Sequence, residues 1–543
     1  MPVYNVVEYV EASVRSVLDQ QVREIELIIV DDASTDGTRA VVERLAQLDP
    51  RIRFIPLIEN TLGGAGTPSN IGLRAARGRY IGFVDGDDLV TTDGFAKLLA
   101  LAERSGADVT VGDFCTFNDG RLEALTPSYD RHRAASLPRN RALSVASHPQ
   151  LLAMSPVPWR KIYSRVFLEA ARIEYPEGDY FFEDNALHWA VLAAADRIAL
   201  CDAVVALHRM GRPGQSMGSG QYRKAAFAHH FELALEVVLQ AEGRRRRVLV
   251  QALADRIAAS QWVLHDQTDP QARAMIGRRF ADLHDRAVRA GAGVRRGKTR
   301  KTIETLREGH QPADLTIVVA ARDGTGLRAT VAPLLTVPHI TVDILVVVPP
   351  EINTKSWFDE SDARIHVFAA GRREPGRMRN AAIPLLTGRY SLFVDEGDRV
   401  EPVALGRAVR HAAESRFDVL FIEDGARADG LRGSGDADVE ALRDIAARID
   451  PATARITRTS LLGAGQVFFG GGAAHYELPF HWQSIALATR LGTAGAPAIS
   501  RSTTPSPEAT KGGPSAETLR YTAHRLTELG AFPGLEAAWR DST

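Results

Sequence analysis

Residues Tyr80–Asp88 read YIGFVDGDD, a short apolar run that ends directly in a turn rich in aspartate. The aromatic and β-branched side chains of the run favour a buried strand. Upstream, Ile25–Val30 (IELIIV) likewise runs into Asp31 and Asp32, and a helical pattern then continues through Leu45. Alternating strands and helices predict an α/β fold with a mostly parallel sheet. Ligands of such sheets bind outside the carboxyl ends of the strands, where both acidic clusters fall.

The pattern around this strand occurs a second time. Residues 78–85 (GRYIGFVD) match residues 388–395 (GRYSLFVD), and Asn70 and Asn380 stand at equal distances before the two stretches. Further along, the sequences FEDNALHW and HYELPFHW, which end at Trp189 and Trp482, are similar to each other. Shared landmarks in the same order predict a duplicated domain.

The length of 543 residues suggests roughly two to four domains, and 45% hydrophobic residues are enough for a core in each. We expect an α/β domain at residues 1–220, a helical region with a basic linker at residues 221–312, and a second α/β domain at residues 313–543. The basic runs Arg244–Arg247 and Arg295–Lys301 predict a solvated helix face and a charged linker, or alternatively contact with an anionic membrane surface.

The charge balance and the cysteine content exclude several classes of protein. The 66 Lys and Arg residues nearly equal the 67 Asp and Glu residues, whereas a protein that mainly binds nucleic acid usually has a basic excess. Two cysteines, Cys115 and Cys201, cannot form a disulfide framework, which favours a reducing compartment. No run approaches the roughly 18–20 apolar residues that span a bilayer, and the first residues do not read as a signal peptide. We therefore expect a cytoplasmic protein, at most peripheral to the inner face of the membrane.

The acidic turn is a candidate metal site. Asp85, Asp87 and Asp88 place carboxylates on a tight turn, and such oxygens suit Mg²⁺ or Mn²⁺ shared with substrate phosphates. The alternative is a plain surface turn or helix cap. Asp32 ends the earlier strand and can accept hydrogen bonds from a base or a ribose hydroxyl, or else cap the next helix.

A second acidic pair precedes an apolar helical stretch. Glu183 and Asp184 follow two aromatic residues, which makes them candidates for a general base. Taken alone, the pair favours simple helix capping over a catalytic role.

Together these motifs resemble the family 2 glycosyltransferases with the GT-A fold, of the bacterial cell-surface polysaccharide type. The resemblance covers about residues 1–220 in consistent order. It rests on Met1–Asn5, Val30–Thr38, Asn70–Leu73, Gly78–Tyr80, Phe83–Asp88, Pro158–Tyr163, Phe181–Asp184 and His208–Ser216.

The resemblance implies an inverting transfer of a sugar from a nucleotide diphosphate sugar, most often a UDP-sugar, to a hydroxyl of a glycan, cell-wall polymer or lipid-linked acceptor. It implies that Asp85, Asp87 and Asp88 hold Mg²⁺ or Mn²⁺, and that Asp184, with Glu183 beside it, is the base. The nucleotide-binding residues that it implies are Pro2, Tyr4, Asp32, Asp85, Lys161 and Arg209.

Two other functions remain open. A sugar nucleotidyltransferase would need a basic, glycine-rich triphosphate loop, and residues 4–12 (YNVVEYVEA) offer none. A protein that binds sugar nucleotides or glycans without catalysis would not need the pair of acidic motifs.

The second copy has lost part of this chemistry. Gly397 stands where the first copy has Asp87, and Pro349 and Pro350 follow the strand that corresponds to the one ending at Asp31. Glu477 remains as a candidate base. We expect a non-catalytic domain that binds acceptor, binds a partner or supports the first domain. The alternative is a second site in which Asp395, Glu396 and Asp398 hold a cation.

The first strand of the first copy also differs from its family. Members usually have a full strand before the Pro2–Asn5 motif, whereas Met1 here stands inside it. We expect either that the natural start lies upstream or that the sheet lacks most of one buried strand, which would leave neighbouring backbone groups unpaired. The second copy keeps the equivalent run, Leu315–Ala321 (LTIVVAA).

Overall fold

The strand that leads into the acidic turn, β4 (Tyr80–Gly82), lies at the edge of a seven-stranded mixed sheet. The strand order is β4-β9-β6-β10-β5, with β7 paired to β6 and β8 paired to β10. Strands β6 and β10 are parallel, whereas β9 runs antiparallel to both β4 and β6. The bounds are β5 (Leu89–Val90), β6 (Val109–Asn118), β7 (Thr126–Pro127), β8 (Ala142–Leu143), β9 (Lys161–Ser164) and β10 (Ile198–Met210).

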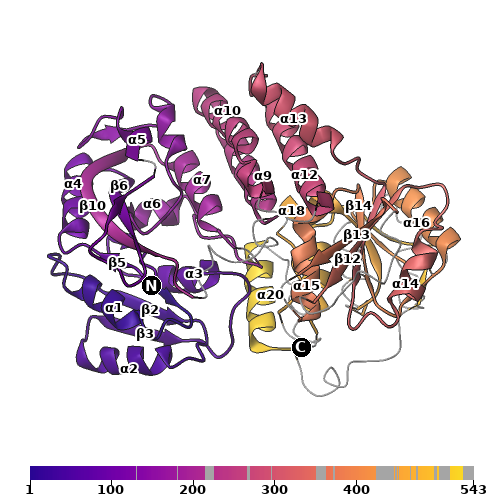
Figure 1. Ribbon diagram of the computed structural model, residues 1–543, viewed down its shortest axis with the longest axis horizontal. Coiled ribbons are helices and arrows are strands. Elements are labelled where there is room, and N and C mark those ends of the chain that lie inside the picture. Colours follow the sequence, from indigo (N-terminus) through magenta and orange to yellow (C-terminus); the bar gives the residue numbers. More distant parts are fainter. Residues whose placement is uncertain are drawn as a thin grey trace. The chain divides into compact units, whose positions relative to one another are not determined.

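A separate parallel sheet holds β1 (Pro2–Val3), β2 (Leu27–Asp31) and β3 (Ile52–Pro56). The helices α1 (Val10–Leu18) and α2 (Thr38–Leu48) lie beside it (Figure 1). In α1 the buried residues recur at helical spacing, at Val10, Val14 and Val17, and they join the core below β2. The remaining helices are α3 (Gly66–Ala75), α4 (Gly94–Ser105), α5 (Arg131–Ala134), α6 (Arg165–Ala170) and α7 (Asp184–Ala194), with a short 3₁₀ helix η1 (Pro149–Ala153).

A helical region follows β10. It contains α9 (Phe227–Gln240), α10 (Gly243–Ala259), α11 (Trp262–His265), α12 (Pro270–Arg289) and α13 (Lys298–Glu308). The chain divides into two compact units, and this region is shared between them. The first unit comprises Met1–Ser219, His230–Ile257 and Leu283–Arg295, and the second comprises Gly220–His229, Ala258–Asp282 and Arg296–Thr543.

The second unit contains one seven-stranded sheet in the order β13-β12-β11-β14-β17-β16-β18, and β15 pairs separately with β19. The strands are β11 (Leu315–Ala320), β12 (Val342–Val348), β13 (Ile365–Ala369), β14 (Tyr390–Asp395), β15 (Arg399–Val400), β16 (Val419–Phe421), β17 (Arg455–Arg458), β18 (Leu491–Thr493) and β19 (Ile499–Ser500). The helices are α14 (Leu327–Leu334), α15 (Pro375–Ala382), α16 (Pro402–Glu414), α18 (Thr459–Ala464), α19 (Glu477–Leu487) and α20 (Ala516–Glu528), with the 3₁₀ helix η3 (Ile383–Leu385).

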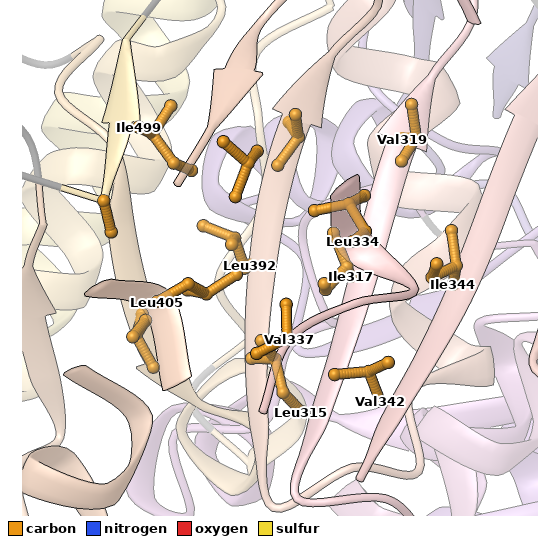
Figure 2. Packing of buried hydrophobic residues seen from close by; sticks show 14 of the residues in the cluster. Leu315, Ile317, Val319, Leu334, Val337, Val342, Ile344, Leu392, Leu405 and Ile499 are labelled. Carbon is orange, nitrogen blue, oxygen red and sulfur yellow. The ribbon is translucent and has the colours of Figure 1, made fainter. Parts of the chain in front are cut away.

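The core of the second unit is built around its central strand. Leu315, Ile317 and Val319 of β11 alternate along the strand and enter one cluster with Leu334 of α14 and Leu405 of α16 (Figure 2). A strand that is buried on both faces reads as a continuous apolar run, which is why LTIVVA is recognisable in the sequence.

The computed structural model describes residues 1–129, 131–179, 181–213, 225–265, 270–294, 296–349, 362–370, 373–422, 446, 449–450, 452–464, 466–471, 475–494, 498–500 and 514–529. Pro350 and Ser216, which the sequence analysis singled out, lie outside these residues.

The two units repeat one arrangement of strands. Leu27 donates from its backbone N–H to Arg51 O over 2.8 Å, and Ile344 donates to Arg364 O over the same distance. The strands β2 and β12 therefore correspond residue by residue, so that Val30 matches Val347. Pro2 pairs with Val30 as Ala320 pairs with Val347, and Pro2 is therefore the counterpart of Ala320.

The central strand differs between the units. β11 pairs with both β12 and β14, whereas the two-residue β1 pairs only with β2. In the described residues, β1–β3 therefore form a sheet apart from β4, whereas β11, β12, β13 and β14 belong to one sheet. A cavity of about 650 Å³ lies between β2 and β4, lined by residues that include Met1, Ile28 and Ile81. We call this cavity the strand slot, because the four residues of β11 that have no counterpart in β1, Leu315–Val318, fill the equivalent space in the second unit.

Candidate functional site

The acidic turn follows β4 and packs closely against β1. A Cβ atom at Gly86 would lie 2.7 Å from Cγ1 of Val3, so only glycine allows this approach. Asp88 is buried and accepts two hydrogen bonds from β10, from Nδ1 of His208 over 2.7 Å and from the backbone N–H of Arg209 over 2.8 Å. Asp88 therefore fixes the turn to the end of β10.

Asp87 meets two arginines, Arg209 near the end of β10 and Arg212 just after that strand. Nε of Arg212 donates to the Asp87 carboxylate, and Nε of Arg209 donates to the Asp87 backbone carbonyl over 2.9 Å. Arg209 also donates to Asp119 over 2.8 Å, and its guanidinium lies 4.7 Å from the ring centroid of Tyr9. Two guanidinium groups thus stand next to the acidic turn, where an anionic diphosphate would find positive charge.

Asp184 shares this site with Asp85. It is the first residue of α7, and its charge acts on the buried carboxyl of Asp85. Burial raises the pKa of Asp184 above its ordinary value, and the charges of Lys161 and His208 oppose this rise. The candidate base and the first residue of the acidic turn therefore lie in one electrostatic environment rather than on opposite sides of the unit.

The carboxylates strongly influence the groups around them. Burial, together with the charges of Asp88 and Asp87, holds the pKa of Asp85 well above its ordinary value. Burial lowers the pKa of His208, but the hydrogen bond to Asp88 and the neighbouring carboxylates outweigh it and raise that pKa to about 9. His208 is therefore an imidazolium at neutral pH. A cluster of buried carboxylates with so much mutual repulsion is a suitable place for a divalent cation.

Glu183 has a different environment from its neighbour. Its carboxylate accepts hydrogen bonds from the backbone N–H groups of Ala65 and Gly66, at the start of α3. A Cβ atom at Gly64 would lie 3.0 Å from Oε1 of Glu183. Burial and the charge of Asp184 raise the pKa of Glu183 to about 7. Glu183 thus holds the start of α7 against α3, and Asp184 is left to face the acidic turn.

Lys161 is buried behind Asp184. Its Nζ donates to Pro156 O over 2.8 Å and lies 3.2 Å from Nδ1 of His188. Burial and the charge of Lys161 hold the pKa of His188 well below its ordinary value, so this imidazole is neutral and its Nδ1 accepts. The second unit has the same arrangement, with Nη1 of Arg455 at 2.6 Å from Nδ1 of His481.

The repeated asparagines anchor the loops that lead to the candidate bases. Asn70 donates to Tyr175 O over 3.0 Å and accepts from Tyr175 N over 2.9 Å. Asn380 makes the same two bonds with Phe469, over 3.0 and 2.8 Å. Phe182 and His475 also share a left-handed backbone, with φ of 63° and 54°. These reciprocal contacts explain why both copies keep an asparagine at this position.

The remaining predicted nucleotide contacts lie on the first sheet. Asp32 is buried directly after β2 and accepts hydrogen bonds from Thr61 N over 2.8 Å and from Nδ2 of Asn60 over 2.9 Å. Pro2 forms part of β1, and Tyr4 follows it with 47% of its surface exposed. Asp32 therefore orders the loop after β3 as well as standing at the carboxyl edge of the sheet.

Sequence reasoning assigned no role to two residues of this site. His208 pairs with Asp88, and Arg212 pairs with Asp87. Both are about 120 residues from their partners in the chain, so no local pattern connects them. The only available signal was their place in the HRMGR stretch, next to Arg209.

The corresponding site of the second unit is filled by its own arginine. Arg379, next to Asn380, takes the position of Ser69 and is almost fully buried. It donates to Asp395 with Nη2, and its Nη1 lies 3.4 Å from Oε1 of Glu477. Its guanidinium also lies 4.7 Å from the ring centroid of Tyr476. The guanidinium of Arg379 thus lies between Asp395 and Glu477, which are the counterparts of Asp85 and Asp184.

None of the described helices combines the length and the hydropathy that a membrane crossing requires.

Comparison with known proteins agrees with the arrangement of the first unit. Residues 1–149 match the family model described as Glycosyl transferase family 2. The Bacillus subtilis protein described as uncharacterized glycosyltransferase EpsJ is 31% identical over 209 residues, which are 38% of this chain and 59% of that protein. The succinoglycan biosynthesis protein ExoO of Rhizobium meliloti is 31% identical over 201 residues, 36% of this chain and 56% of that protein. The chain spans somewhat more than half the length of these curated relatives.

One solved structure is also similar. The crystal structure of S. aureus TarS 1-349 in complex with UDP aligns with 57% of this chain and 90% of that chain, at 20% identity and a TM-score of 0.43. The predicted α/β class and the predicted family resemblance are confirmed, and residues 1–149 form a glycosyl transferase family 2 domain.

Proposed function

We propose that this family 2 domain transfers a sugar from a nucleotide diphosphate sugar, with UDP as the carrier nucleotide, to a hydroxyl group of a glycan, cell-wall polymer or lipid-linked acceptor. The strongest support is that Asp184, at the start of α7, acts electrostatically on Asp85 in the acidic turn. Asp184 can then receive the proton of the acceptor hydroxyl while Asp85 helps to stabilise the charge of the leaving nucleotide.

The donor binds along the carboxyl edge of the strands in this proposal. Asp32 meets the base or ribose, beside Pro2 and Tyr4 of the β1 segment, and Arg209 and Arg212 attract the diphosphate. Asp85 and Asp87 are the residues that hold Mg²⁺ or Mn²⁺, because their carboxylates are the ligands that these ions prefer. When bound, the ion draws negative charge from the leaving nucleotide. Asp88 keeps the turn in place through His208 and Arg209 N.

Asp184 acts as the base on the acceptor hydroxyl. Burial raises the pKa of Asp184, which improves its capacity to take a proton, and the charges of Lys161 and His208 oppose this rise. We therefore assign Lys161 a positioning role at Asp184, since its Nζ already contacts Pro156 O and His188. A single base opposite a single activated leaving group corresponds to one displacement, which inverts the anomeric centre.

The second α/β domain is non-catalytic in this proposal. Arg379 takes up the charge of Asp395 and Glu477, so these carboxylates are not available to a cation or an acceptor proton. The domain supports the first one or binds acceptor polymer or a partner.

A donor screen tests the proposed function. Nucleotide release from UDP-, GDP- and dTDP-sugars would be measured with candidate acceptors, with Mn²⁺ or Mg²⁺ and with chelator. We expect release that needs the ion, and we expect Asp87→Ala and Asp184→Asn each to reduce it at least about 100-fold. Asp398→Ala, in the second domain, is the matched control and should keep the rate.

Other outcomes would identify the alternatives. A nucleotidyltransferase would release pyrophosphate from UTP in the presence of a sugar phosphate. A binding protein would bind the sugar nucleotide and release nothing under any of these conditions.

A further inference from the structure

Two histidines and an aspartate meet in the second unit, away from both acidic sites. His310 stands between α13 and β11, Asp343 is the second residue of β12, and His366 is the second residue of β13. Nε2 of His310 lies 3.1 Å from Oδ2 of Asp343, and Nε2 of His366 lies 3.6 Å from Oδ1. The side chains are only 9%, 10% and 6% exposed, in the same order.

This cluster is remote from the edge where the acidic residues stand. Asp343 and His366 are at the amino ends of their parallel strands, whereas Asp395 is the last residue of β14. Parallel strands place these two ends at opposite edges of the sheet. The cluster therefore has no part in the proposed transfer reaction.

The distances suit a metal ion. One ligand atom from each of the three side chains lies within 4.8 Å of the others. Zinc–ligand bonds of about 2.0–2.2 Å in tetrahedral geometry place neighbouring ligand atoms roughly 3.4 Å apart. The distances from Asp343 to His310 and to His366, 3.1 and 3.6 Å, lie on either side of this value.

The type of ligand indicates which ions would bind. Two imidazole nitrogens and one carboxylate oxygen favour Zn²⁺ and neighbouring late first-row ions over Mg²⁺ or Ca²⁺, which prefer oxygen only. The buried Asp343 carboxylate also needs a positive partner.

The first unit uses different residues at this corner of the fold. Leu27 pairs with Ile52 as Ile344 pairs with Ile365, so Glu26 corresponds to Asp343 and Arg53 corresponds to His366. Glu26 accepts from the backbone N–H groups of Arg77 and Gly78, over 2.7 and 3.0 Å. The carboxylate is thus common to both units, and the two imidazoles belong to the second unit alone.

We propose that His310, Asp343 and His366 form a binding site for Zn²⁺ or a similar late first-row divalent ion. The ion fastens the segment between α13 and β11 to the amino edge of the sheet. Oγ1 of Thr387 lies 2.9 Å from the same nitrogen, Nε2 of His310, so this hydroxyl must release Nε2 when the ion binds.

Cobalt binding to the full-length protein tests this site. After treatment with chelator and dialysis, Co²⁺ would be added at neutral pH, and the visible absorption of four-coordinate Co²⁺ would be recorded. We expect one equivalent to bind, Zn²⁺ to displace it, and the thermal midpoint to rise with Zn²⁺. His366→Ala and Asp343→Asn should each weaken Co²⁺ binding at least about tenfold.

Two controls separate this site from others. His411→Ala removes an exposed histidine of the same unit, and Asp87→Ala removes a carboxylate of the acidic turn; both should keep the cobalt band. Circular dichroism checks that each variant is folded. If His366→Ala or Asp343→Asn is unfolded, His310→Gln is measured in its place. No cobalt band in the parent protein, or a band that remains in folded His366→Ala and Asp343→Asn, would overturn the proposal.

Discussion

Lys161 offers a test of the base that does not remove the base itself. Asp184 must be ionised to accept a proton, so transfer should fall as pH drops through its pKa. The charge of Lys161 lowers this pKa. Lys161→Met should therefore move the acidic limb of the kcat/KM profile to higher pH. Arg455→Met, the corresponding change in the second unit, should leave the profile unmoved. If both profiles coincide with that of the parent protein, Lys161 does not act on Asp184.

The paired asparagines allow a matched comparison of structure and function. Asn70→Ala and Asn380→Ala each remove two reciprocal bonds to a loop backbone. Each should cost roughly 2–3 kcal/mol of unfolding free energy, because buried backbone groups lose their partners. Only Asn70→Ala should also slow sugar transfer, since the Tyr175 loop leads to Asp184. Denaturant unfolding and initial rates measure the two effects, and an equal loss of rate in both variants would contradict the assignment.

At the level of residues, the sequence predicts what is local. Asp85, Asp87 and Asp88 follow an apolar strand within a few positions, so their placement at the edge of a sheet is readable. The partners that determine their chemistry, His208 and Arg212, come from the far end of β10, and only the folded chain brings them to the turn.

At the scale of secondary-structure elements, the central strand is the main difference between the two units. β11 is a full strand with a partner on each side, whereas β1 has two residues and one partner. Long apolar runs such as β11 and β12 were predictable from their sequence alone. Two-residue strands such as β5 and β8 were not, because only their pairing with β10 defines them.

Filling the strand slot should stabilise the first unit. We would add Leu-Thr-Ile-Val, the sequence of Leu315–Val318, in front of Met1. The added residues would bury three apolar side chains between β2 and β4 and would form backbone hydrogen bonds with both strands. The conformational entropy lost on ordering four residues opposes this gain. A net gain of about 2 kcal/mol corresponds to a rise in Tm of roughly 4–8 °C. Calorimetry measures it, with a Ser-Gly-Ser-Asn extension of equal length as the control. Equal Tm values for the two extensions would contradict the prediction.

At the scale of the whole molecule, one fold occurs twice with different chemistry. The sequence predicted the duplication because apolar strands and anchoring asparagines persist in both copies. It also suggested the loss of chemistry at Gly397, but it gave no sign that Arg379 supplies the missing positive charge. That contact joins α15, β14 and α19, which are far apart in the chain.

Removing Arg379 should lower the stability of the second unit while leaving the rate of sugar transfer nearly unchanged. Arg379→Ala leaves Asp395 and Glu477 without their partner and should cost the second unit roughly 2–4 kcal/mol, less than a fully buried pair because Asp395 is partly exposed. Sugar transfer should stay within about twofold of the parent rate. Arg389→Ala, at an exposed arginine of the same unit, should change stability by no more than about 0.5 kcal/mol. A large loss of transfer in folded Arg379→Ala would show that the second domain takes part in the reaction.

The strand slot also bears on how the protein behaves in solution. β2 and β4 face it with backbone edges that, in the described residues, only Met1–Val3 partly covers. Uncovered strand edges attract other extended chains. Concentrated preparations should therefore tend to self-associate, and a short peptide that occupies the slot should keep them monodisperse.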